Sequence, residues 1–293
     1  MNIGDSLIAG GSISLKEINQ DYFLQTEIAE VKCYVLVVAD GLGSFHYSEV
    51  ASEFVCKKFL EAIEKLENVK DIDLVNIFEE VQIELKKKYE EEIPEDDRIK
   101  NAYGTTLISC IETLDDFIIG YVGNGGIFHI RGDFNNFPER FYLPWNSINL
   151  LNPHSKEEEG KNAMYKFLSP NGHPEQIIPS VIRLTKDRFG SGDIIMICTD
   201  GIYSYDEVKI GKDPNGKIWI SGETAMELFY KHLKLFFKKE DYNNDNLKES
   251  IQDYLGELKS KKLLDDDATL SLLISSTALN YQKSLTQMNE EDK

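Results

Sequence analysis

Carboxylates stand at the ends of three apolar segments that are far apart in the sequence. They are Asp40 after residues 33–39 (CYVLVVA), Asp200 after residues 194–199 (IIMICT), and Asp266 just before residues 268–274. Carboxylates that are brought together repel one another unless a cation neutralises them, and a site made of oxygen ligands suits Mg²⁺ or Mn²⁺. If the three segment ends converge, Asp40, Asp200 and Asp266 predict a divalent-metal site.

Glycine follows the aspartate at two of these places, in Asp40-Gly41 and Asp200-Gly201. The glycine permits a turn and leaves its backbone carbonyl accessible for metal ligation. Taken singly, an Asp-Gly pair is more often an ordinary turn. The metal-site prediction therefore depends on all three carboxylates together and not on either pair alone.

The apolar segments have the composition of buried β-strands. Residues 33–39 form a nearly continuous β-branched and apolar run, which is typical of a strand buried on both faces, and residues 194–199 do the same. Residues 104–112, 116–123 and 126–132 are short apolar segments separated by Asp or Gly turns. Their close spacing favours antiparallel strands.

Apolar residues recur at helical spacing in four places, so that each set lies on one face of a helix. The sets are Ala51, Val55, Phe59, Ala62 and Leu66; Leu74, Phe78, Val81 and Leu85; Met226, Tyr230, Leu233 and Phe237; and Leu247, Ile251, Tyr254 and Leu258. One helix pair follows the first strands and another precedes the last strand. We therefore predict an α+β fold, an αββα four-layer sandwich of two antiparallel sheets flanked by helix pairs. A parallel doubly wound sheet fits less well, because it needs a helix between most consecutive strands.

The chain is long enough to bury one large core, with 293 residues of which 41% are hydrophobic. No linker rich in Pro, Gly or Ser divides it, so we predict one domain over residues 1–276. Within this domain, residues 133–180 hold most of the prolines and are expected to form a loop-rich insertion. Residues 277–293 are polar and charged, which predicts a frayed C-terminal tail.

Composition argues against several classes of partner. The formal net charge of -19 makes nucleic acid a poor partner, because Lys and Arg must neutralise its phosphates. The chain has no run of 18 apolar residues and no leader-like start, so we expect no membrane association and a cytoplasmic location. Cys33, Cys56, Cys110 and Cys198 are far apart in apolar segments, which favours neither disulfides nor a zinc site. We expect a monomer.

Six short motifs follow one another in an order that resembles a known family. They are Asn19-Gln20-Asp21, VADGLGS (38–44), GTT (104–106), YVGNGGIF (121–128), CTDGI (198–202) and DDAT (266–269). In order and spacing they resemble the type 2C metal-dependent protein phosphatases of bacterial type, whose fold is an αββα sandwich. The resemblance implies hydrolysis of phosphate monoesters, on phosphoserine and phosphothreonine of proteins.

The resemblance also implies two Mn²⁺ or Mg²⁺ ions. Asp40 would bridge both ions, the Gly41 carbonyl would complete one shell, and Asp200 and Asp266 would hold the other ion. Asp21 would lie in or just behind this shell. Two such ions lower the pKa of a bridging water, so that hydroxide attacks phosphorus in line and no phosphoenzyme is expected.

Lys16 stands five residues before Asp21, where the family usually has an arginine that grips the substrate phosphate. Lysine offers a point charge in place of a bidentate fork, and an ordinary exposed strand residue is an equally good interpretation. The insertion at residues 133–180 lies where the family carries a variable flap beside the active site. The expected partners are a phosphorylated protein substrate and a cognate serine/threonine kinase.

Besides Lys16, two residues depart from the family pattern. Asn124 replaces the carboxylate that many bacterial members use for a third metal, and Leu42 cannot act as an acid. His46 is near the same turn, but a lone loop histidine is more often a surface residue than a general acid. Three alternatives therefore stay open: a pseudophosphatase that acts as a binding module, a phosphohydrolase of a small metabolite, and an unrelated α+β interaction protein that binds no Mn²⁺.

Overall fold

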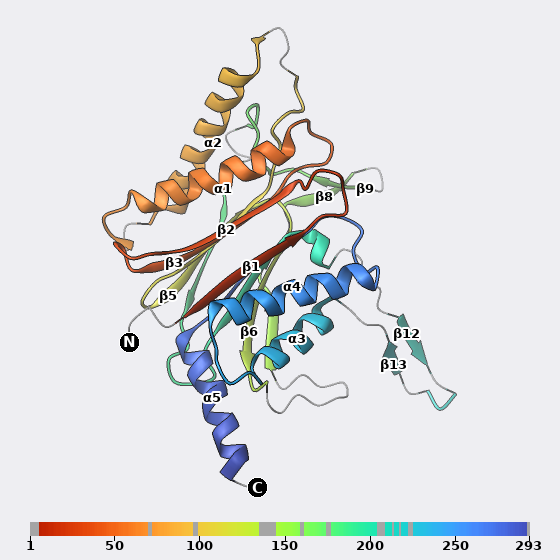
Figure 1. Cartoon of the computed structure of the whole chain (residues 1–293). Coiled ribbons are helices and arrows are strands. Elements are labelled where there is room, and N and C mark those ends of the chain that lie inside the picture. Colours follow the sequence, from red (N-terminus) through yellow and green to blue (C-terminus); the bar gives the residue numbers. More distant parts are fainter. Residues whose placement is uncertain are drawn as a thin grey trace.

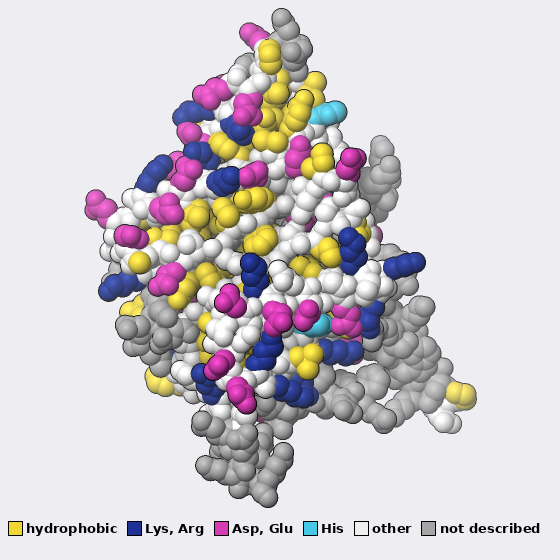
Figure 2. Space-filling model, viewed as in Figure 1, with side chains coloured by type: hydrophobic (Ala, Val, Ile, Leu, Met, Phe, Trp, Pro, Cys, Tyr) yellow, Lys and Arg dark blue, Asp and Glu magenta, His cyan; other side chains and the backbone are white. Residues whose placement is uncertain are grey.

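The computed structural model describes most of the chain. The described residues are 6–69, 72–95, 99–134, 145–158, 161–173, 177–203, 209–212, 214–216, 218–221 and 225–291. Within them, no helix has the length and apolar character needed to cross a bilayer. On the face shown in Figure 2, acidic side chains are interspersed with basic ones, so the excess of negative charge is not gathered in one patch there.

Two five-stranded antiparallel sheets lie at the centre of the molecule (Figure 1). The first has the order β10 (Ser180–Thr185), β5 (Asp116–Val122), β4 (Leu107–Glu112), β3 (Cys33–Asp40) and β2 (Asp21–Ile28). The second has the order β1 (Leu7–Ile13), β14 (Ala268–Ile274), β11 (Ile194–Cys198), β6 (Gly126–Gly132) and β7 (Trp145–Asn149). The strands predicted from apolar runs are all present, since these runs lie inside the sandwich.

Side chains along β3 point alternately to the two faces of the sheet, which explains why its apolar run is continuous. Leu36 and Val38 belong to the cluster between the sheets, together with Ile195 of the opposite sheet. Val35 and Val37 point the other way, into the cluster that the helices cover. Because successive strand side chains point to opposite faces, a strand buried on both faces needs apolar residues throughout.

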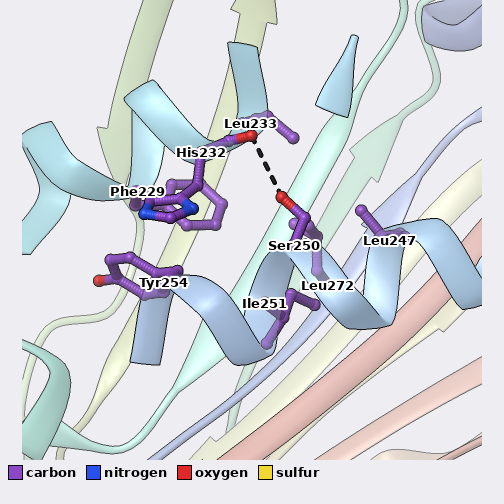
Figure 3. Close-up of a pocket in the computed structure, with 8 residues that line it drawn as sticks. All are labelled: Phe229, His232, Leu233, Leu247, Ser250, Ile251, Tyr254 and Leu272. Atoms are coloured by element: carbon purple, nitrogen blue, oxygen red, sulfur yellow. Dashed lines mark hydrogen bonds between the residues drawn. The ribbon is translucent and has the colours of Figure 1, made fainter. Parts of the chain in front are cut away.

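A pair of helices covers the outer face of each sheet (Figure 1). Helices α1 (Ser48–Glu64) and α2 (Leu74–Glu92) cover the first sheet, and α3 (Ala225–Phe236) and α4 (Asn244–Ser260) cover the second. Aromatic and aliphatic side chains line a small pocket between α3 and α4, where the Ser250 hydroxyl also donates to the His232 carbonyl at 3.2 Å (Figure 3). The predicted αββα sandwich is confirmed.

The C-terminal segment differs from its prediction. Residues predicted to be a frayed tail from Thr277 form helix α5 (Ser276–Glu291), in which Ala278 and Leu279 are buried. Gln282 is also buried, and its side chain accepts from the Phe134 backbone N–H at 3.1 Å and donates to the Gly132 carbonyl at 2.7 Å. The prediction was wrong because a few buried residues and one amide hold in place a helix whose sequence is mostly polar.

The insertion at residues 133–180 contains more strand than its composition indicates. Besides β7 it holds a two-stranded hairpin of β8 (Ser155–Glu158) and β9 (Lys161–Met164). A second hairpin, β12 (Lys209–Lys212) and β13 (Ile218–Ser221), follows β11. Residues 135–144, 159–160 and 174–176 of the insertion lie outside the described residues.

Candidate active site

The topology brings four aspartates to one end of the sandwich. Asp21 begins β2 and Asp40 ends β3, and the two are directly opposite in the antiparallel register. Asp200 begins a 3-10 turn (η5, Asp200–Ile202) directly after β11. Asp266 lies just before β14, which pairs with β11. The segment ends that the sequence predicts to converge therefore do so.

Asp40 is at the centre of this group, within hydrogen-bonding reach of both Asp21 and Asp200. Burial raises the pKa of Asp40 well above its usual value, and the charges of Asp21, Asp200 and Asp266 add to that effect. Burial likewise raises the pKa of Asp200, with further contributions from Asp266 and Asp265. The group carries more negative charge than its surroundings can stabilise.

Asp21 is the most deeply buried of the four, and burial raises its pKa to about 7. Hydrogen bonds from Thr199, Thr269 and Asp40 act in the opposite direction, because they favour the charged carboxylate. The Thr199 hydroxyl lies 2.8 Å from Asp21 Oδ2. These contacts fix Asp21 behind Asp40 rather than at the surface.

Backbone contacts fix Asp40 and its glycine. The Asp40 carbonyl accepts from the Thr106 N–H at 2.8 Å and from the Thr105 hydroxyl at 2.9 Å, which gives the GTT motif a structural role. The Gly41 N–H donates to the Gln20 carbonyl at 3.0 Å. A Cβ at Gly41 would lie 2.7 Å from the Ser48 carbonyl oxygen, so this close approach requires glycine.

Lys16 reaches the same end of the sandwich from the connection between β1 and β2. Its Nζ lies 2.5 Å from Asp266 Oδ1 and 2.6 Å from Gln20 Oε1. Partial burial lowers the pKa of Lys16, but the carboxylates of Asp266, Asp267 and Asp40 raise it by more. Lys16 is therefore a charged amine beside the aspartates.

Asp267 was not singled out from the sequence, and the structure shows it to organise this connection. Its buried carboxylate accepts from the backbone N–H groups of Leu15 at 2.9 Å, Lys16 at 3.2 Å and Gln20 at 3.0 Å. Burial alone raises the pKa of Asp267, but these bonds and one from Ser14 lower it overall. Its place directly before a buried strand, in a run of three aspartates, is the sequence feature that distinguishes it.

Asn124 contacts the group from the turn between β5 and β6. Its amide Nδ2 donates to Asp200 Oδ2. Its Oδ1 is buried, and within the described ranges it has no hydrogen-bond partner. The Leu42 backbone N–H donates to the Gly104 carbonyl at 2.9 Å, and the His46 side chain is exposed.

Residues 3–249 match the family model described as Protein phosphatase 2C. The chain belongs to the protein phosphatase 2C family. The match covers most of the chain, so it confirms the resemblance that the ordered motifs predict. No curated protein sequence matches this protein phosphatase 2C chain.

Solved structures share the fold of this protein phosphatase 2C chain at low identity. The S. agalactiae serine/threonine phosphatase is 15% identical with a TM-score of 0.62, over 92% of this chain and 99% of that chain. Stp1 from Staphylococcus aureus is 16% identical with a TM-score of 0.60, over 92% and 94%. The catalytic domain of PstP, in complex with two manganese ions, is 14% identical with a TM-score of 0.56, over 92% and 97%.

In this protein phosphatase 2C chain, the carboxylates of the four aspartates face one another, and they also face the side chains of Asn124 and Lys16. As the side chains lie, no three His, Cys, Asp or Glu residues of the described ranges surround a common point as metal ligands do. The donor set is nevertheless four carboxylates at one end of two sheets, and Asp40 contacts both Asp21 and Asp200. The raised pKa values of Asp21, Asp40 and Asp200 are those of carboxylates that a nearby cation would stabilise in the charged form.

Proposed function

We propose that this protein hydrolyses phosphate monoesters on phosphoserine and phosphothreonine of proteins, with the help of two divalent cations. The observation that carries the proposal is the contact of Asp40 with Asp21 and Asp200 inside the protein. Clustering carboxylates without a cation lowers the stability of the fold. A binding module of the same fold could avoid this loss by having uncharged residues at these positions.

The residues present fit Mn²⁺ or Mg²⁺. Carboxylate and carbonyl oxygens are the ligands that these hard cations take, and the structure offers Asp40, Asp200, Asp266, Asp21 and the Gly41 carbonyl. Asp40 would contact both ions, because it lies between Asp21 and Asp200. When bound, such ions lower the pKa of water and neutralise phosphate oxygens.

The remaining groups would bind and orient the substrate. Lys16 places a positive charge at the rim, where it would hold a phosphate oxygen. Asp267 holds the backbone on both sides of Lys16, so that the amine has a defined position. Asn124 donates to Asp200 and thereby fixes which oxygen of that carboxylate faces the group.

The proposed substrate class rests on the family and on the solved structures that share this fold. Stp1 and the S. agalactiae protein are serine/threonine phosphatases, and the PstP structure contains two manganese ions. By analogy, the partners of this chain would be a phosphorylated protein substrate and a serine/threonine kinase. A phosphohydrolase of small metabolites would instead prefer phosphometabolites to phosphopeptides.

Hydrolysis of p-nitrophenyl phosphate tests the proposal. We expect activity with Mn²⁺, none with EDTA, and none in a folded Asp200→Asn variant. Asp253→Asn, which removes an exposed carboxylate of α4, is the matched control and keeps full activity. Inactivity of the folded wild type with Mn²⁺ bound would indicate the pseudophosphatase, for which Asn124 and Lys16 are the sequence arguments.

A further inference from the structure

A hollow lies directly beside the candidate active site, between the β1–β2 connection and the start of α1. Its volume is about 420 Å³, and its lining residues are Lys16, Glu17, Ile18, Gln20, Gly43 and Glu49. Because Lys16 belongs to both the hollow and the aspartate group, a substrate whose phosphate lies beside Lys16 must place neighbouring residues in or over the hollow.

The walls of the hollow differ in chemistry. Ile18 is 59% exposed and provides an apolar wall. Glu17 and Glu49 provide two carboxylates, and none of the ion pairs between described residues includes either of them. The one amine of the lining, on Lys16, is turned toward Asp266 and Gln20. The hollow therefore combines an apolar surface with negative charge that has no counter-ion in the described chain.

A lysine or arginine side chain has the complementary chemistry. Its aliphatic stem packs on apolar surface while its charged head stays near carboxylates. The formal net charge of -19 also attracts basic segments to the molecule over a longer range.

We propose that this hollow binds a Lys or Arg side chain that lies close in sequence to the phosphorylated residue of the substrate. The inference rests on the proposed function and adds a substrate class to it, namely phosphoproteins with a basic residue beside the phosphorylated one. Glu17 and Glu49 are the residues that determine this preference, and Ile18 contacts the stem.

Binding of phosphopeptide analogues tests the inference. The peptides carry phosphonomethylalanine, which resembles phosphoserine but resists hydrolysis, and Arg, norleucine or Glu at each position within about three residues of it. Dissociation constants are measured by fluorescence anisotropy with Mn²⁺. We expect the Arg peptide to bind about five- to tenfold more tightly than the norleucine peptide at one or more positions.

The double variant Glu17→Gln with Glu49→Gln should bring this ratio close to one. The matched control, Glu64→Gln with Glu67→Gln, makes the same change in net charge at the far end of α1 and should keep the ratio. An equal affinity for Arg and norleucine peptides at every position overturns the inference, and so does a ratio that survives in the first double variant. Failure of the proposed function is separate, because it appears as absence of p-nitrophenyl phosphate hydrolysis.

Discussion

Asp40 is a residue at which function opposes stability. Burial of its carboxylate raises its pKa, and the charges of Asp21 and Asp200 beside it add to that effect. Groups that are perturbed in this way by burial and by like charges concentrate at functional sites. Replacing one of them should therefore stabilise the metal-free protein and remove its activity.

The variant Asp40→Asn tests this opposition. Without metal, loss of one buried negative charge should raise the free energy of unfolding by about 1 kcal/mol, and the melting temperature by about 2–4 °C. Activity toward p-nitrophenyl phosphate should fall at least about a thousandfold. Thermal unfolding in EDTA and steady-state kinetics in Mn²⁺ measure the two effects. A variant that loses stability as well as activity would show that Asp40 serves the fold instead.

Lys16 permits a second test at the same scale. Lys16→Met removes the positive charge beside Asp266 and should raise KM for p-nitrophenyl phosphate about tenfold. Lys16→Arg should keep or lower KM, because a guanidinium fork binds a phosphate through two oxygens. If Lys16→Met leaves KM and kcat unchanged, Lys16 is only a surface residue paired with Asp266.

At the scale of elements, the turn η5 positions Asp200, and its close packing on the entry to β14 depends on glycine. A Cβ at Gly201 would lie 1.9 Å from the Asp267 carbonyl oxygen, which is backbone and cannot rotate away. Gly201→Ala should therefore lower the free energy of unfolding by about 3 kcal/mol and displace Asp200, with loss of activity.

Gly256→Ala is the control, because a Cβ there meets nothing within 4 Å on the exposed side of α4. Gly256→Ala should raise the free energy of unfolding by about 0.5–1 kcal/mol. Urea unfolding measures both, and equal effects would contradict the packing argument.

His154 connects the insertion to the turn between β5 and β6. Its Nδ1 accepts from the Gly123 N–H at 3.1 Å, so its Nε2 carries the proton and lies 2.9 Å from the Ser180 hydroxyl. Burial lowers the pKa of His154 to about 4, and the charge of Lys166 adds to this. The unfolded chain binds a proton at His154 near pH 6.5 and the folded protein does not, so stability falls as pH falls from about 6.5 to about 4.

Urea unfolding at pH 7 and pH 5 in EDTA measures this effect. Between these values the wild type should lose about 2 kcal/mol more stability than His154→Asn, which has no imidazole to titrate. The other titrating groups are common to both proteins and cancel in the comparison. The same loss in both would mean that His154 is protonated in the folded state.

The strands that the sequence predicts are those buried on both faces, and β1 was not predicted because of its glycines. Its sequence LIAGGSI places Gly10 and Gly11 in the middle of the strand. A Cβ at Gly10 would lie 2.7 Å from the Phe23 ring, and one at Gly11 would lie 2.9 Å from the Ile251 side chain. These glycines serve close packing against β2 and α4, which no local pattern of the sequence reveals.

The site was predictable where residues follow a buried strand, and less so where a contact depends on tertiary structure. Asp40 and Asp200 stand at strand ends, so their position follows from the apolar runs before them. Asp267 and Thr199 act on backbone and carboxylate groups that are distant in sequence. Their roles depend on how the β1–β2 connection and β11 meet, which only the fold determines.

At the scale of the whole molecule, the two ends of the sandwich differ in the groups that lie beside their buried carboxylates. At the end that holds Asp40, this carboxylate contacts those of Asp21 and Asp200. At the other end, Glu112 of β4 pairs with Lys186, and Asp193 before β11 accepts from Arg131 at 2.7 Å. Glu112 and Asp193 are paired with cations and serve the fold, whereas Asp40 lies against two other carboxylates and is available for a ligand.

The pair of Glu112 and Lys186 permits a direct test of this contrast. Glu112 is fully buried, and besides Lys186 it accepts from the Ser6 hydroxyl at 3.0 Å. Lys186→Met should lower the free energy of unfolding by about 3–5 kcal/mol, because it leaves the buried Glu112 charge without its partner. The value of kcat/KM should not change. Adding Glu112→Leu should restore at least about half of that loss.

Lys248→Met, which removes an exposed amine of α4, is the control for these variants and should change stability by less than about 1 kcal/mol. Urea unfolding in EDTA compares all of them with Asp40→Asn. Lys186→Met should destabilise the protein because it leaves buried Glu112 without its cation, whereas Asp40→Asn should stabilise it because it removes a carboxylate that lies against two others. The same sign at both ends would contradict the view that the Asp40 group is kept for a bound cation.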